Sequence, residues 1–168
     1  FNYCFYCVLG GDSGSNIASS IMWVTTNGID YAVLNLLSLV PITQSGVVVV
    51  NDTFVYLIGG RHPLSSAVYS SIWYSISPFV TWYNNSQLPT PLYSAVTLYY
   101  KTRFHVTVGH TGTVLNSQHY SWSFYPNGTL YNCTSVPLPS GMARANAAGC
   151  VFNSQMFVTG KCACKLTT

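Results

Sequence analysis

The stretch FVYLIGG, residues 54–60, decides how this sequence folds, because it is an apolar strand that ends in a glycine pair. The same kind of strand end occurs three more times, where FYCVLGG, FHVTVGH and MFVTGK reach Gly10, Gly109 and Gly160. Together with Gly59, these glycines are spaced by 49, 50 and 51 residues. A period of this length is typical of proteins built from one repeated supersecondary unit.

Two further markers recur at the same interval. Tryptophans follow each other at steps of 50 and 49 residues, at Trp23, Trp73 and Trp122. Turn dipeptides follow at steps of 50 residues, at Asn27-Gly28, Ser77-Pro78 and Asn127-Gly128. Three series in register predict a single repeat domain over residues 1–168, with units at 1–44, 45–93, 94–142 and 143–168.

The second unit shows what is repeated. It contains four short runs rich in β-branched and aromatic residues, SGVVVV, FVYLIGG, VYSSIWYSI and FVTWYNN. Residues that favour turns separate these runs, so we expect four antiparallel strands. The third unit repeats the pattern, the first lacks the opening strand, and the last has only the opening two. The sequence therefore predicts an all-β fold of thirteen strands without helices, in groups of three, four, four and two.

Two local expectations follow from this register. The Asn127-Gly128 pair predicts a type I′ hairpin turn, since both central residues of that turn need positive φ. The three tryptophans fall at equivalent places in their units, so we expect Trp73 to be largely buried between neighbouring sheets.

The composition excludes several classes of protein. Charged residues make up only 5% of the chain, against about 25% in ordinary soluble domains. The six Lys and Arg residues are scattered, whereas a nucleic-acid-binding surface needs clustered cations to neutralise phosphates. The apolar runs are far shorter than the ~20 residues of a membrane-spanning helix. Uncharged polar residues must cover the surface, which suits a protein that is glycosylated or packed against neighbours.

Sequons and cysteines favour an extracellular or cell-surface location. Four Asn-x-Ser/Thr sequons occur, at Asn51, Asn84, Asn127 and Asn132, and we expect N-linked glycans there. Asn51 and Asn127 fall at predicted hairpin turns, where a glycan can stand clear of the fold. Six cysteines are compatible with disulfides in a secreted chain. The first residues already belong to a strand, so we expect this chain to be the visible part of a longer polypeptide.

The cysteines divide into an end group and an internal pair. The end group, Cys4, Cys7, Cys162 and Cys164, lies within the first or last seven residues. Disulfides that staple the ends or join subunits are the leading interpretation, with buried free thiols and a metal site as alternatives. Cys133 and Cys150 lie on predicted strands and are interpreted as buried thiols or as further disulfide partners.

No catalytic residue, metal site or cofactor is predicted. Asp12, Asp30 and Asp52 fall in different predicted elements, so no carboxylate pair for glycoside hydrolysis is suggested. His105 lies within a predicted strand and is interpreted as structural. His62 and His110 occupy equivalent loops after the second strand of their units, which makes them candidate ligand contacts on one face of the fold.

The units resemble kelch repeats, which have a glycine doublet after the second strand, aromatic residues in the third and fourth, and a proline-rich link. The resemblance rests on Gly59-Gly60, Trp73-Tyr74, Trp82 and LPTPLYSAV, and in the first unit on Gly10-Gly11, Trp23, Tyr31 and Pro41. The third unit has His110 after its glycine and the fourth has Lys161. The resemblance implies a β-propeller of four-stranded blades, of which this chain would supply about 3.3.

These observations lead to one functional expectation and two alternatives. We expect a non-enzymatic structural and interaction protein that contacts other copies of itself or the rest of a longer chain, as the repeating subunit of an extracellular filament or coat. An intracellular kelch adaptor that binds a protein partner through its loops is the first alternative. A propeller copper oxidase or carbohydrate-active enzyme is the second.

Overall fold

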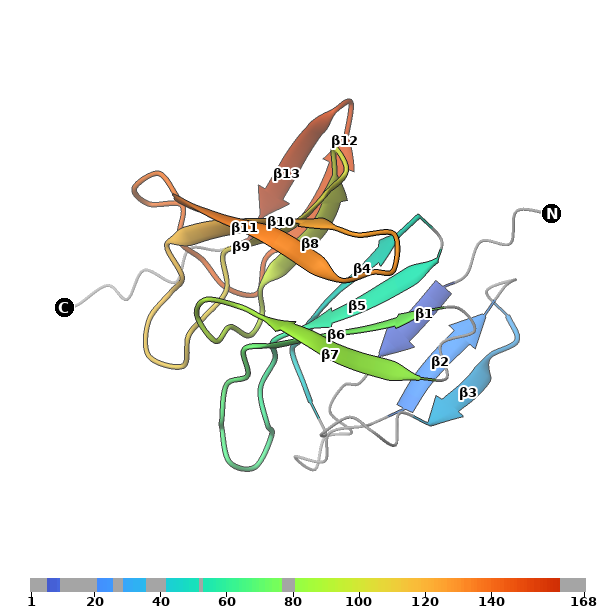
Figure 1. The fold of residues 1–168 in the computed structure, drawn as a ribbon. Coiled ribbons are helices and arrows are strands. Elements are labelled where there is room, and N and C mark those ends of the chain that lie inside the picture. The colour runs from blue at the N-terminus through green and yellow to red at the C-terminus, as the bar shows by residue number, and fades with distance from the viewer. Residues whose placement is uncertain are drawn as a thin grey trace.

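The structure is a computed structural model that describes residues 6–9, 21–25, 29–35, 42–51, 53–76 and 81–160. All regular elements in these ranges are β-strands, and thirteen of them form four antiparallel sheets (Figure 1). The predicted all-β class and the grouping of strands into three, four, four and two are therefore confirmed. The four sheets do not form a closed ring within the described residues.

Each sheet is a meander in which consecutive strands pair. The first sheet contains β1 (Tyr6–Leu9), β2 (Ile21–Thr25) and β3 (Ala32–Asn35). The second contains β4 (Gly46–Val50), β5 (Phe54–Ile58), β6 (Ser71–Ile76) and β7 (Trp82–Gln87). The third contains β8 (Val96–Tyr100), β9 (Arg103–Thr107), β10 (Gln118–Phe124) and β11 (Leu130–Pro137). The fourth contains only β12 (Ala148–Phe152) and β13 (Gln155–Thr159).

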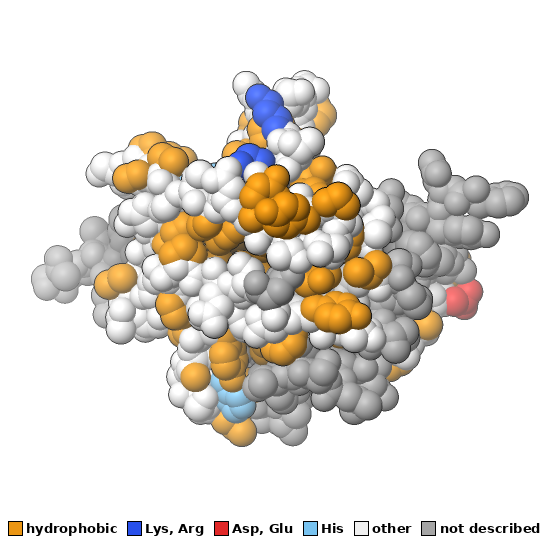
Figure 2. All heavy atoms as spheres, viewed as in Figure 1, with side chains coloured by type: hydrophobic (Ala, Val, Ile, Leu, Met, Phe, Trp, Pro, Cys, Tyr) orange, Lys and Arg blue, Asp and Glu red, His pale blue; other side chains and the backbone are white. Residues whose placement is uncertain are grey.

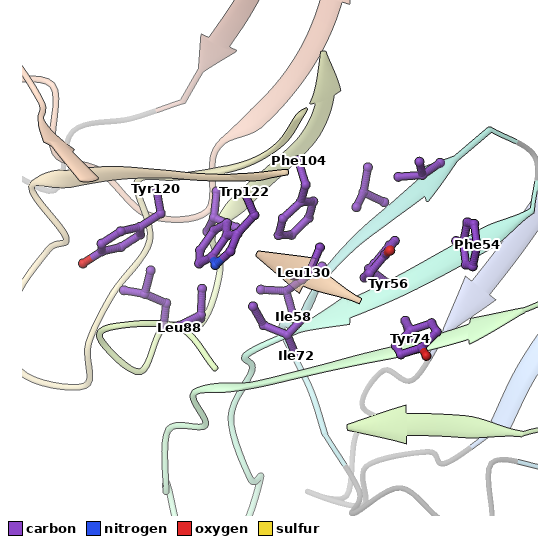
Figure 3. Packing of buried hydrophobic residues seen from close by; sticks show 14 residues of the cluster. Phe54, Tyr56, Ile58, Ile72, Tyr74, Leu88, Phe104, Tyr120, Trp122 and Leu130 are labelled. Atoms are coloured by element: carbon purple, nitrogen blue, oxygen red, sulfur yellow. The ribbon is translucent and has the colours of Figure 1, made fainter. Parts of the chain in front are cut away.

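The core lies between the second and third sheets (Figure 3). Alternate side chains of a strand point to one face, so the apolar residues of β5 and β6 meet those of β9 and β10. Tyr56 and Phe104 are both completely buried, and their ring centroids lie 5.6 Å apart. Trp122 packs on Phe104 at 5.4 Å. Burial of each large side chain stabilises the fold by about 1.5–3 kcal/mol. The packing of the second sheet on the third is therefore the main hydrophobic contribution to stability within the described residues.

The first strands of the two sheets also approach closely. A Cβ atom on Gly46 of β4 would lie 2.3 Å from Cγ2 of Thr97 on β8. The Thr97 hydroxyl donates a hydrogen bond to the Val47 carbonyl at 2.8 Å. The absence of a side chain at Gly46 therefore allows β4 and β8 to pack side by side.

The backbone itself gives the register of the repeat. Gln44, Ser94 and Asn146 lie two residues before β4, β8 and β12, and their φ angles are 56°, 51° and 52°. The Ser94 amide donates to the Gln44 carbonyl at 2.8 Å, which ties one unit to the next. The units therefore begin at steps of 50 and 52 residues, close to the predicted period.

The predicted glycine alignment is wrong by one residue in the third unit. Gly109 has a φ of 100° and matches Gly60, at 107°, rather than Gly59. The Gly60 and Gly109 amides make equivalent bonds to the segments that lead into β8 and β12, donating to the Leu92 and Arg144 carbonyls. The turn between β8 and β9 is one residue shorter than the turn between β4 and β5, which shifts the later positions. Val108 consequently takes the place of Gly59, with a φ of 55°.

The predicted equivalence of the tryptophans is wrong for the same kind of reason. Trp73 pairs with Leu57, and the matching position in the third sheet is Tyr120, which pairs with Val106. The bridged loop from His110 to Leu115 is two residues shorter than the loop from Arg61 to Val68. Trp122 is buried, but Trp73 is only partly buried, so the expectation of a largely buried Trp73 is not met.

The turn at Asn127-Gly128 is not type I′. Gly128 has a φ of 87°, whereas Asn127 does not have a positive φ. The Gly128 amide donates to the Tyr125 carbonyl at 2.9 Å, and the Tyr125 amide donates to the Thr129 carbonyl at 2.8 Å. This pattern is a type I turn followed by a left-handed glycine. Pro126 explains it, because proline fixes φ near −65° and favours the second position of a type I turn.

Candidate functional site

The meander gives the stacked sheets two different ends. The short hairpin turns between strands, such as 51–53 and 125–129, lie at one end, called here the turn end. The longer connections, 59–70 and 108–117, lie at the opposite end, called here the loop end. The predicted glycan sites Asn51 and Asn127 therefore lie at the opposite end from the predicted ligand contacts His62 and His110.

The four predicted sequons are all accessible. Asn51 and Asn127 lie in hairpin turns at the turn end, as predicted, and both are exposed. Asn84 on β7 and Asn132 on β11 are exposed as well. Accessibility is the structural requirement for a bulky modification, so each site remains a prediction that chemical analysis can test.

At the loop end, the structure brings together three side chains from two units. The Arg61 guanidinium lies over the Tyr93 ring, 5.6 Å from its centroid, which is within the range of a cation–π contact. Tyr93 also packs against the His110 ring at 5.2 Å. Arg61 and His110 are equivalent in the repeat, because each makes the isolated bridge that follows the second strand. Of these three residues the sequence predicts only His110 as a ligand contact, because no motif marks Arg61 or Tyr93.

The predicted ligand contacts His62 and His110 support their own loops. His62 Nδ1 accepts hydrogen bonds from the amides of Leu64 and Ser65, at 3.3 and 3.2 Å. His110 Nδ1 accepts one from the Gly112 amide at 2.9 Å. The two loops are equivalent as predicted, but the histidines differ by one position within them. The Nδ1 lone pairs of both histidines already accept these hydrogen bonds, so the two Nδ1 atoms stabilise the conformations of their own loops.

The face of the third sheet that points away from the second is called here the polar face, and it contains Arg103, His105, Thr107, His119 and Ser121. His105, Thr107 and Ser121 are buried there. The Arg103 guanidinium donates to Ser121 Oγ at 3.2 Å and to Ser123 Oγ at 2.9 Å. It also reaches the Ser121 and Asn132 carbonyls, both at 3.1 Å. All of these acceptors are uncharged, so the cation is held by hydroxyl and carbonyl oxygens.

Two histidines adjoin on the polar face. His105 Nδ1 lies 3.1 Å from His119 Nε2, and His105 Nε2 lies 3.2 Å from the Tyr100 carbonyl. The carbonyl can only accept, so His105 carries its proton on Nε2 and His119 donates to Nδ1. Burial lowers the pKa of His105; the Tyr100 carbonyl opposes this shift and the Arg103 charge adds to it. Burial also lowers the pKa of His119, and His105 lowers it further.

The fourth sheet covers only part of the third. A Cβ on Gly149 would lie 2.3 Å from Cγ1 of Val96, so β12 packs on β8 as β8 packs on β4. The Tyr100 hydroxyl donates to the Ser154 carbonyl. Residues of the fourth sheet remain largely exposed, and Phe152 and Phe157 are 63% and 46% exposed.

The two internal cysteines are free thiols in the structure, and both are exposed. The interpretation of Cys133 and Cys150 as buried thiols is therefore wrong, because no other sheet of the described residues covers these side chains on β11 and β12. Partial burial of its sulfur raises the pKa of the Cys133 thiol, against the lowering effect of Arg103. Cys4, Cys162 and Cys164 lie outside the described residues, as does the side chain of Cys7 on β1.

Catalytic or metal-binding groups do not converge in the part of the chain that the structure describes. No three His, Cys, Asp or Glu side chains in that part gather closely enough to hold a metal ion. Asp30 is exposed, and Asp12 and Asp52 fall outside the described ranges. The same ranges contain no apolar helix of the length needed to cross a membrane. On the face shown in Figure 2, charged side chains are sparse and hydrophobic ones lie among uncharged polar atoms.

No protein-family model matches the chain, and no curated protein matches it.

Proposed function

We propose that this chain is a secreted or cell-surface glycoprotein with a structural and interaction role, which assembles with further copies of itself. The kelch-like β-propeller is the architecture that we propose for the complete assembly. The proposal joins three properties: stacking of four-stranded sheets, a sparsely charged surface with four accessible sequons, and a two-stranded sheet with exposed apolar side chains.

The exposed apolar side chains of the fourth sheet are the observation that carries the proposal. Its two strands expose Val151, Phe152, Met156 and Phe157. Between the second and third sheets, side chains of this kind are buried by the neighbouring sheet. Exposed apolar residues favour burial against a partner, and a sheet from a second copy would supply such a surface.

Assembly can be tested by light scattering on native material at micromolar concentration. We expect a mass above that of one chain, and we expect Phe157→Asp to reduce it by placing a charge in the contact. The matched control is Leu64→Asp, which changes an apolar residue that is 74% exposed at the loop end. A monomeric wild-type protein, or equal loss of assembly in both variants, would contradict the proposed contact.

Secretion can be tested separately by the intact mass of native material before and after removal of N-linked glycans. We expect a loss of mass that corresponds to glycans on at least Asn51 and Asn127. Unmodified peptides at all four sequons would contradict the extracellular assignment, whatever the assembly state.

A further inference from the structure

The hairpin turn at Asn127 has an exposed aromatic pair beside it. Tyr125 and Tyr131 stack with their ring centroids 4.2 Å apart and their planes at 25°. They are 50% and 41% exposed. Large aromatic side chains normally contribute stability through burial. Among the ring pairs in the described part of the chain, this one has the shortest separation and the greatest exposure.

The turn holds the sequon close to these rings. Tyr125 and Thr129 close the turn through a hydrogen bond, so Asn127 lies within the same five residues as Tyr125. The Asn127 Oδ1 accepts a hydrogen bond from the Thr129 amide at 3.0 Å. That bond fixes the orientation of the side-chain amide, whose Nδ2 is the atom that carries a glycan.

Packing against the second sheet makes the turn rigid. A Cβ on Gly128 would lie 2.7 Å from the Phe54 ring and 2.8 Å from the Tyr74 ring. The Tyr56 hydroxyl donates to the Gly128 carbonyl at 2.7 Å. The turn is therefore anchored to the core, and the direction in which Asn127 leaves the surface is defined.

We propose that the Tyr125–Tyr131 stack is a platform on which the first N-acetylglucosamine of a glycan at Asn127 rests. In the modified protein, Nδ2 has exchanged one hydrogen for a bond to the anomeric carbon of the sugar, and the lipid pyrophosphate that carried the sugar leaves with the proton. The C–H bonds on one face of the sugar are weakly positive, and the face of an aromatic ring is negative. The inference rests on the proposed function, since it requires that Asn127 is glycosylated.

The other sequons lack an exposed aromatic residue two positions before the asparagine. The residue two positions before the asparagine is aliphatic or buried at each of them: Val49 before Asn51, Trp82 before Asn84 and Leu130 before Asn132. Asn51 is the matched control, because it also lies in an exposed hairpin turn at the turn end.

The platform can be tested by a thermodynamic cycle on the whole chain, made in a secretory host and trimmed to a single N-acetylglucosamine per site. Thr129→Ala removes the Asn127 sequon, and Tyr125→Leu removes the platform. We expect loss of the sugar to lower Tm by roughly 1–6 °C when Tyr125 is present, the range that one aromatic contact gives in a chain of this size. We expect the loss to disappear in Tyr125→Leu and to persist in Tyr125→Phe, and we expect no Tyr125-dependent change when Thr53→Ala removes the Asn51 sequon.

A second readout does not depend on the stability of the variants. Ring currents should shift the proton resonances of the Asn127 sugar upfield in the wild-type protein, but not those of the Asn51 sugar. Equal Tm losses with and without Tyr125, together with unshifted sugar resonances, would overturn the platform and leave secretion unaffected. Absence of glycan in native material would instead contradict the proposed function, while the secreted chain would still test the platform.

Discussion

One face of the second sheet and the equivalent face of the third have the same backbone register and opposite chemistry. Where the second sheet has Phe54, Tyr56, Ile58, Ile72 and Tyr74, the third has Arg103, His105, Thr107, His119 and Ser121. The first face is buried against the third sheet. On the second face His105, Thr107 and Ser121 are buried as well, and β12 packs along β8. The same strand geometry therefore presents an apolar face in one sheet and a hydrogen-bonded polar face in the next.

The largest expected effect is on the apolar side of this comparison. Phe104 is completely buried and contacts both Tyr56 and Trp122. Removal of a buried phenylalanine side chain costs about 3–5 kcal/mol, so Phe104→Ala should lower the free energy of unfolding by that amount in chemical denaturation. Phe152→Ala is the control, because Phe152 is 63% exposed. A similar small loss in both variants would show that the second and third sheets do not stack.

A smaller loss is expected on the polar side. Arg103→Met keeps an unbranched chain but removes the guanidinium donors to Ser121, Ser123 and Asn132. An acceptor left without a partner in a partly buried site costs about 1–3 kcal/mol. We expect denaturation to show a loss in this range and no measurable change for Lys101→Met, which is exposed. A neutral Arg103→Met variant would mean that the network contributes nothing to the fold.

The smallest effect is a dependence on pH. The pKa values of His105 and His119 are lowered in the folded protein, so the unfolded chain binds protons more readily. This contribution to stability is complete above the unfolded histidine pKa of about 6.5 and decreases as pH falls below it. Urea midpoints measured from pH 7.5 to 5 should fall with pH, and His119→Gln should reduce the slope. A His62→Gln variant should keep the wild-type slope, and a midpoint that rises on acidification would contradict the assignment.

Much of the fold could be predicted from the sequence, because alternation and turn residues act locally. The number of strands and their grouping follow from runs such as residues 45–50 and 54–58. The register of the third unit could not be predicted, since it depends on the lengths of connections that differ by one or two residues. Val108 takes the position that Gly59 has in the second unit, with a φ of 55°. Nothing in the sequence indicates that a valine adopts this backbone conformation.

The candidate sites could also be predicted only in part. The sequons are visible as motifs, and the structure confirms that Asn51 and Asn127 lie in turns. The contacts of Arg103 and the stack of Tyr125 on Tyr131 depend on which residues face each other across strands. Such pairs become predictable only when the strand register is known. The tryptophan spacing predicted a wrong register for the third unit, because it aligned Trp122 instead of Tyr120 with Trp73.

A double-mutant cycle across the two sheets tests the central claim most directly. Tyr56 and Phe104 come from different sheets, and their rings are 5.6 Å apart. The free energy of unfolding of Tyr56→Leu, Phe104→Leu and the double variant should give a coupling of about 0.5–1.5 kcal/mol, as expected for packed aromatic rings. Strictly additive losses would contradict the stacking of the second sheet on the third, and with it the repeat architecture.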